Sequence, residues 1–141
     1  MPYDAQLTAD LGLARAADPM QVVQQVAVGL PAKALEGLSR RIAPADANFR
    51  YRLVPKATLA RRKEAKPPRL SPDESERLVR VASVWRLAEQ VWGGEAEARR
   101  FLFAPHPLLE GQTPIDVTLG GELGAKVVED VLGRLAYGSA V

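Results

Sequence analysis

The sequence predicts an all-α protein, with a helix-turn-helix bundle followed by a second helical domain. Apolar residues recur at three- and four-residue steps in successive segments, which is the period of an amphipathic helix. Helix-start signals containing aspartate, serine, threonine or proline precede several of these segments, and proline or glycine separates them. A chain of 141 residues has room for one compact domain or two small ones.

The N-terminal part contains two expected helices after a less certain start. Residues 1–18 carry scattered leucines and many alanines, so we expect a weakly docked helix or a disordered segment. Asp18-Pro19 then begins a helix, with aspartate as the N-cap and proline at the first position. Its predicted inner stripe is Met20, Val23, Val26, Ala27 and Leu30. A second helix follows Pro31, with predicted inner residues Ala34, Leu35, Leu38 and Ile42.

Two further short helices are expected, and the second of them is basic. Ala45–Leu53 is predicted to form the first, and Lys56–Ala65 the second, with a tight turn at Val54-Pro55. Leu59 is the only apolar anchor that we expect the second helix to bury. Two short helices joined in this way form the helix-turn-helix arrangement.

The charge of the chain is segregated, although its net value is only +2. Residues 40–69 hold ten basic and two acidic side chains, a net charge of +8. The flanking blocks are negative, with a net charge of −2 over residues 1–39 and −4 over residues 70–141. This segregation predicts an anionic partner for the middle block.

The basic helix has two interpretations. It can be a solvated face, and Arg40 and Arg41 also suit the C-terminal end of their own helix. Alternatively, the basic helix enters the major groove of DNA, with Thr58, Arg61 and Arg62 facing the bases. The residues then expected to contact DNA are Arg40, Arg41, Arg52, Lys56, Thr58, Arg61, Arg62 and Lys63. About five phosphate contacts predict a slope of log K against log salt of roughly −4 to −5.

Lys66-Pro67-Pro68-Arg69 predicts an extended connector, because a residue that precedes proline avoids the helical region. A long helix follows, opened by Ser71 as N-cap, Pro72 at the first position and Glu74 in a capping box. Its expected inner residues are Leu78, Val81, Ala82, Trp85, Ala88 and Val91. The expected division of the chain is an N-terminal segment 1–18, a helix-turn-helix domain 19–66 and a C-terminal domain 67–141.

The stretch Phe101–Asp116, FLFAPHPLLEGQTPID, links two helical segments through three prolines and one glycine. Proline fixes φ and removes an amide donor, so this stretch is neither a continuous helix nor a central strand. It also carries six large apolar residues. Such a loop either packs on its own core or meets another protein, and both interpretations remain open at this point.

Two helices are expected after this loop. Thr113-Pro114 begins the first, and Glu122 begins the closing helix. We expect Gly124 and Gly133 to mark points of close packing, because glycine weakens a helix interior relative to alanine. The predicted inner residues of the closing helix are Leu123, Val127, Val128, Val131, Leu132 and Leu135.

No residue pattern predicts an active site. The sequence has no cysteine, and its single histidine, His106, lies between two prolines without a second histidine to share a metal. No serine has a nucleophile setting, and no glycine loop has the context of a phosphate site. No apolar run approaches the ~20 residues of a membrane span, and Asp4 is unlike a signal peptide. We therefore expect a cytoplasmic, non-enzymatic protein without cofactor, metal or membrane contact.

Motifs in the C-terminal half resemble the toxin-binding domain of the Xre/MbcA/ParS antitoxins. Phe101 stands where this family has tryptophan, His106 where it has asparagine, and Glu110-Gly111 where it has two glycines. The run Thr58-Leu59-Ala60-Arg61-Arg62-Lys63 also resembles the family's recognition helix, and the likeness extends over Met20–Gly138. The motifs that carry it are Phe101-Leu102, Pro105-His106-Pro107, Leu109-Glu110-Gly111, Thr113-Pro114-Ile115-Asp116 and Gly133-Arg134-Leu135-Ala136-Tyr137-Gly138.

The resemblance implies a type II antitoxin whose partners are a RES-domain toxin and operator DNA. Toxins of this kind consume NAD or use it for ADP-ribosylation, and the C-terminal domain would cover the toxin's active-site entrance. A homodimer is expected, because a two-fold protein matches a two-fold operator. The residues expected at the toxin are Pro107, Leu108, Leu109, Gly111, Pro114, Gly138, Ser139, Ala140 and Val141. The alternatives are a stand-alone dimeric helix-turn-helix regulator and a non-DNA adaptor.

Overall fold

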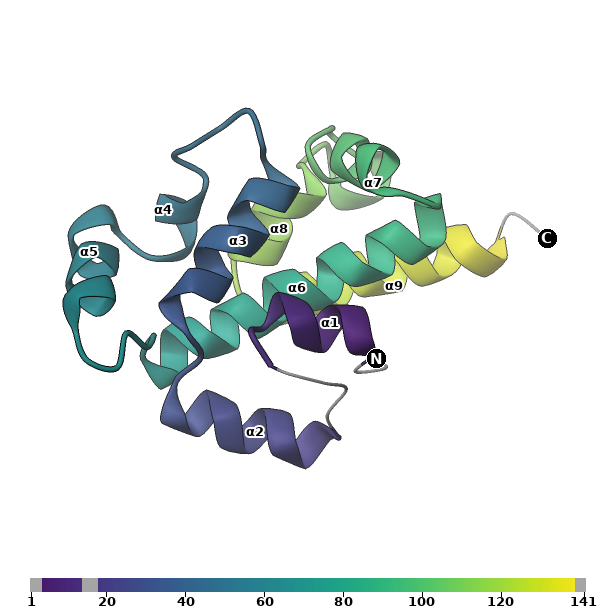
Figure 1. The fold of residues 1–141 in the computed structure, drawn as a ribbon. Helices are drawn as coiled ribbons and strands as arrows, with labels where there is room; N and C mark the ends of the chain where they lie inside the picture. The colour runs from purple at the N-terminus through teal and green to yellow at the C-terminus, as the bar shows by residue number, and fades with distance from the viewer. Residues whose placement is uncertain (1–3, 14–17, 139–141) are drawn as a thin grey trace. The chain divides into compact units, whose positions relative to one another are not determined.

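The computed structural model describes residues 4–13 and 18–138 of the chain (Figure 1). These residues contain no β-strand, and one isolated antiparallel bridge joins Pro31 to Arg69. The prediction of an all-α fold is therefore confirmed. The helices are α1 (Ala5–Asp10), α2 (Pro19–Val28), α3 (Ala32–Ile42), α4 (Arg50–Leu53), α5 (Lys56–Glu64), α6 (Pro72–Trp92), α7 (Glu95–Leu102), the 3-10 helix η1 (Pro107–Leu109), α8 (Pro114–Leu119) and α9 (Glu122–Gly138).

The chain forms two compact units, Met1–Ala82 and Ser83–Val141, which divide within α6. The boundary expected from the sequence, at Lys66-Pro67, falls inside the first unit because the connector is bonded to it. The Leu70 amide donates to the Leu30 carbonyl at 2.8 Å, and the Ala32 amide donates to the Pro68 carbonyl at 3.0 Å. Backbone hydrogen bonds of this kind make the proline connector a structural part of the first unit.

A helix-turn-helix lies in the first unit. α4 and α5 are joined by the Val54-Pro55 turn, and α3 packs against both helices. Leu59 is the only residue of α5 that is buried, as predicted. It meets a core whose other large members include Leu35, Leu38, Ile42, Phe49, Leu53 and Leu78. Burial of one leucine leaves the rest of α5 at the surface.

The N-terminal segment includes a docked helix rather than a disordered stretch over residues 4–13. The Asp4 carboxylate accepts a hydrogen bond from the Leu7 amide at 2.9 Å, which caps α1. Leu7 and Leu11 are both fully buried, and α1 packs against α3. The apolar residues of this segment therefore belong to the core of the first unit.

The predicted inner stripe of α2 is wrong for Met20, Val23 and Ala27, although Leu30, just after the helix, is buried as predicted and the start of α2 is confirmed. The Asp18 carboxylate accepts from the Gln21 amide at 2.9 Å and completes a capping box. However, Val22 is the residue that α2 buries, whereas Met20 and Val23 are 62% and 56% exposed. The apolar residues of this short helix lie on more than one of its sides, so periodicity alone did not identify the side that packs.

The predicted helix over Ala45–Leu53 is shorter than expected. Only Arg50–Leu53 is α-helical, and turns occupy most of the preceding residues. The Asp46 carboxylate accepts from the Asn48 amide at 2.9 Å. A local side-chain bond of this kind satisfies the backbone in a turn and competes with helix formation.

The second unit is organised around aromatic and aliphatic contacts. Phe101 of α7 is buried, and its ring centroid lies 5.8 Å from those of Trp92 and His106. Thr113 caps α8 as predicted, since its hydroxyl accepts from the Asp116 amide at 3.2 Å. The other buried residues of this unit include Trp85, Ala88, Ala98, Leu102, Leu109, Ile115, Val128, Val131 and Leu132.

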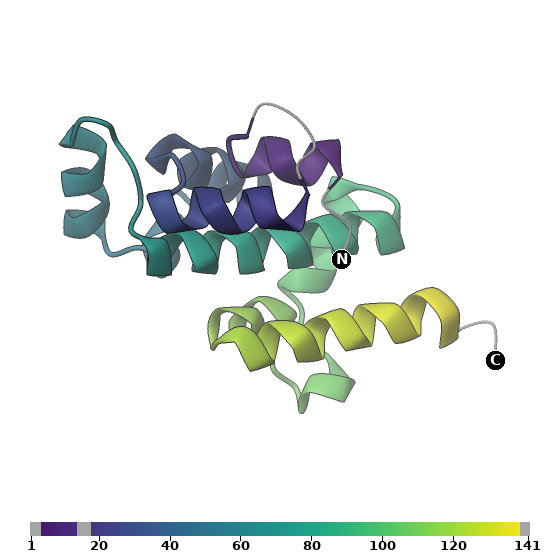
Figure 2. The same ribbon diagram turned by 90° about the horizontal axis from the view of Figure 1, so that it is seen from below.

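α9 packs against α8 and continues to the C-terminal end of the described chain (Figure 2). A Cβ atom on Gly124 would lie 2.0 Å from the Val117 carbonyl oxygen, so the predicted close packing at Gly124 is confirmed. The prediction for Leu123 and Val127 is wrong, because they are 76% and 39% exposed. Both lie outside the buried stripe that contains Val128, so α9 has apolar residues on an exposed side as well as on its packed side.

Candidate DNA-contacting and partner-binding surfaces

Two ion pairs hold α5 to its neighbours. Arg62 forms a bidentate pair with Glu74 at the start of α6, with Nε–Oε1 and NH2–Oε2 distances of 3.0 and 3.2 Å. Lys63 Nζ lies 2.8 Å from Glu36 Oε1 on α3, and Arg50 NH1 lies 2.6 Å from Glu36 Oε2. The two glutamates therefore fix the orientation of α5 around its buried leucine.

The pKa values of both glutamates reflect these pairs. Burial alone would raise the pKa of Glu36, but hydrogen bonds and charges from Lys63 and Arg50 outweigh burial and lower that pKa. Glu74 behaves in the same way, with Arg62 and the Ser71 amide, whose bond is 2.8 Å long, lowering its pKa. Glu74 therefore has two roles: it forms the predicted capping box with Ser71, and it is the acidic partner of Arg62.

We predict that Glu36→Gln makes the stability of the first unit less dependent on pH. A carboxylate with a lowered pKa stabilises the fold above its unfolded pKa, 4.5 here, and that contribution is lost as pH falls through the folded value. Urea unfolding at about pH 7 should show a loss of roughly 1–2 kcal/mol in the variant, and the loss should shrink at about pH 3. The exposed Glu76→Gln is the control, and an equal loss at both pH values would contradict the prediction.

The structure divides the predicted DNA contacts into two groups. Arg41 pairs with Asp10, so it is engaged within the first unit in the same way as Arg62 and Lys63. Arg62 and Thr58 are half-buried rather than fully outside. Among the residues that the structure describes, the predicted contacts that are exposed and form no ion pair are Arg40, Lys56 and Arg61. Exposed Arg52 lies over the Phe49 ring.

Sequence reasoning missed the acidic partners Asp10, Glu36 and Glu74. Glu36 lies off the stripe formed by Leu35, Leu38 and Ile42, and only the fold buries it. A buried carboxylate requires a cationic or hydrogen-bonding partner. The basic block was therefore the obvious source of its partners, although the sequence did not indicate which side chains reach it.

The proline loop forms a compact turn. The His106 carbonyl accepts from the Gly111 amide at 3.0 Å, and the His106 amide donates to the Gln112 carbonyl at 3.1 Å. His106 Nδ1 also accepts from the Leu108 amide at 3.1 Å. Glu110 adopts a left-handed φ of 56° and Gly111 one of 82°, which turns the chain back toward α8.

This turn exposes only part of the predicted toxin-contact set. Leu108 is 52% exposed, and Pro107, Gly111 and Gly138 are also at the surface. Leu109 and Pro114 are buried in the second unit, so their placement at a partner surface is wrong. Their side chains instead fix the loop to its own core. The predicted contacts Ser139, Ala140 and Val141 lie outside the described residues.

Comparisons with known proteins identify both units. Residues 21–83 match the antitoxin Xre-like helix-turn-helix domain, and residues 87–138 match the antitoxin Xre/MbcA/ParS C-terminal toxin-binding domain. Antitoxin Xre of Pseudomonas putida strain KT2440 is 33% identical over 138 residues, which cover 96% of this chain and 84% of that relative. The chain belongs to the Xre antitoxin family.

The two family matches place the basic helix and the proline loop of this antitoxin in different domains. α5 lies in the helix-turn-helix match, and the proline loop and α9 lie in the toxin-binding match. The two matches adjoin near the point in α6 where the compact units divide. Antitoxins of this family are regulatory binding proteins rather than enzymes, as the sequence predicted.

Over residues 4–13 and 18–138, no helix combines the length and the apolar character needed to cross a bilayer. In the same described ranges, no group of three or more histidine, aspartate and glutamate side chains is arranged to hold a metal ion.

Proposed function

We propose that this antitoxin neutralises a RES-domain toxin, which consumes NAD or uses it for ADP-ribosylation, by covering the toxin's active-site entrance. The proposal includes binding of α5 to the operator of its own operon, with the antitoxin acting as a homodimeric, cytoplasmic repressor. The observation that carries the toxin assignment is the exposure of Leu108. This large apolar side chain is half exposed on a hydrogen-bonded turn within the toxin-binding match.

The shape of the proline loop supports tight association. Its backbone is already ordered by hydrogen bonds and two left-handed residues, so binding a partner costs little conformational entropy. The proposed contact set is now Pro107, Leu108 and Gly111, with Leu109 and Pro114 anchoring the loop from below. The end of α9 at Gly138 and the residues that follow it complete the proposed surface.

Co-expression tests the toxin assignment directly. The proposal requires a RES-domain protein in an adjacent reading frame. That protein should arrest growth alone, and growth should recover when the antitoxin is produced with it. The two proteins should also co-purify. A stand-alone regulator would bind operator DNA in a gel shift and yet neither rescue growth nor retain the toxin, which would contradict the proposal.

The DNA assignment rests on Arg61. It is exposed on α5, whereas its neighbours Arg62 and Lys63 are engaged in ion pairs. A guanidinium in this setting can pair bidentately with a guanine. The proposed phosphate contacts are the exposed Arg40, Arg52 and Lys56. The slope of log K against log salt should therefore be roughly −3 per bound chain, smaller than the sequence alone predicts.

We predict that Arg61→Ala weakens binding to the gene's own upstream DNA. Loss of one bidentate base contact should cost about 1–3 kcal/mol and relax sequence preference at one position. A gel shift with wild-type and shuffled upstream DNA measures both effects. Arg100→Ala, an exposed arginine on α7, is the matched control. Undiminished binding by Arg61→Ala, or affinity that ignores salt, would contradict the assignment.

A further inference from the structure

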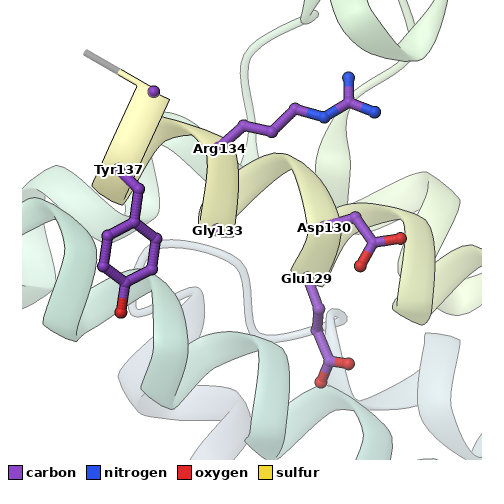
Figure 3. A pocket seen from close by; sticks show the side chains of 6 residues that line it. Glu129, Asp130, Gly133, Arg134 and Tyr137 are labelled. Atoms are coloured by element: carbon purple, nitrogen blue, oxygen red, sulfur yellow. The ribbon is translucent and has the colours of Figure 1, made fainter. Parts of the chain in front are cut away.

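The last turns of α9 carry an open surface hollow with a volume of about 550 Å³ (Figure 3). All of its lining residues belong to this one helix, so its shape depends on which side chains α9 carries and which it lacks. They are Glu129, Asp130, Gly133, Arg134, Tyr137 and Gly138. The hollow lies within the part of the chain that matches the toxin-binding domain.

No packing contact within the described chain explains why a glycine stands at position 133. A Cβ atom at this position would meet nothing within 4 Å, and the residue has ordinary helical backbone rather than a positive φ. The close packing predicted at Gly133 is therefore wrong, in contrast to Gly124. Glycine in a helix interior is less stable than alanine. Because Gly133 has no side chain, only backbone forms the floor of the hollow at this position.

The walls of the hollow have a definite chemistry. Glu129 and Tyr137 lie one helical turn on either side of Gly133, and Figure 3 shows both side chains pointing to the same side of α9. Tyr137 is 80% exposed, so its ring is available to a partner. A carboxylate and an aromatic ring on either side of a bare backbone suit a long basic side chain. Its stem can lie over the glycine and its cation between the carboxylate and the ring.

We propose that this hollow receives a lysine or arginine side chain of the toxin. The inference rests on the proposed function, because it requires a toxin partner for the second unit. Charge complementarity supports a basic occupant. Two carboxylates, Glu129 and Asp130, and one guanidinium, Arg134, line the hollow, so its net charge is −1, and residues 70–141 have a net charge of −4. The hollow thus extends the proposed toxin contact from the loop onto the last turns of α9.

Gly133→Ala tests the hollow with a single methyl group. The methyl should raise the unfolding temperature of the second unit and should weaken binding to the RES-domain toxin of the proposed function at least ~10-fold. Gly37→Ala in α3 is the matched control, since a Cβ there also meets nothing within 4 Å. That variant should leave toxin affinity unchanged. Unchanged affinity of Gly133→Ala would overturn the proposal.

Charge variants test the chemistry of the occupant. Glu129→Gln and Tyr137→Ala should each weaken the same complex roughly 10-fold, and the effect of Glu129→Gln should shrink in high salt. Undiminished affinity in both variants would overturn the proposal that a basic side chain occupies the hollow. Failure of the unchanged antitoxin to bind or neutralise that toxin would instead overturn the proposed function, and this inference with it. Normal wild-type binding with unaffected variants would overturn this inference alone.

Discussion

Leu108→Asp should abolish toxin neutralisation while leaving the fold of the antitoxin intact. The side chain is half exposed, so a carboxylate remains solvated in the free protein and stability should change by less than ~0.5 kcal/mol. In the complex, the same carboxylate would be placed against an apolar surface and lose its water. Loss of a central apolar contact costs at least ~2 kcal/mol, which is roughly a 30-fold loss of affinity.

Growth rescue and a binding titration with the purified toxin measure this effect. Met20→Asp is the matched control, because Met20 is 62% exposed and lies outside the toxin-binding match. It also stands in the first turn of α2, where a negative charge is favourable. Full rescue by Leu108→Asp, with an affinity equal to that of the control, would show that the proline loop does not contact the toxin.

Features that depend on neighbouring residues could be predicted from the sequence. The caps at Asp18, Ser71 and Thr113 were expected and are present, because each requires only a side chain and an amide three residues later. Leu59 was recognised as the single anchor of α5 for a similar reason, since the surrounding residues are nearly all polar or small. The all-α class follows from many such local signals agreeing.

Features that depend on distant residues could not be predicted. The basic side chains of Arg41, Arg62 and Lys63 are equally prominent in the sequence, and only the fold brings each of them to a carboxylate on another helix. The sequence therefore did not show which cations are paired within the fold. A charge pattern predicts the sign of a surface, whereas the identity of the unpaired side chains requires the packing.

The faces of α2 and α9 show a related difficulty. Periodicity assumes that apolar residues face the core, yet Val23 and Leu123 are exposed while Val22 and Val128 are buried. Apolar side chains that stay at the surface follow the same period as core residues, so the period alone does not separate the two. Errors of this kind are expected at binding surfaces, because stability and function there favour different residues.

Gly124→Ala should unfold or strongly destabilise the second unit. The new Cβ would lie 2.0 Å from the Val117 carbonyl oxygen and 3.0 Å from its carbon. A backbone carbonyl in α8 cannot move aside as a flexible side chain can, so α8 and α9 would have to separate. Overpacking of this kind costs about 1–3 kcal/mol or more, which exceeds the ~1 kcal/mol gained from the helix propensity of alanine.

Tryptophan fluorescence isolates this effect, because the two tryptophans of the chain, Trp85 and Trp92, both lie in the second unit. A net loss of ~2 kcal/mol should lower the midpoint of the fluorescence transition by roughly 10 °C. Gly133→Ala makes the same substitution in the same helix without a clash, so its midpoint should rise. Shifts of the same sign in both variants would mean that helix propensity, rather than the contact between α8 and Gly124, determines why glycine stands at these positions.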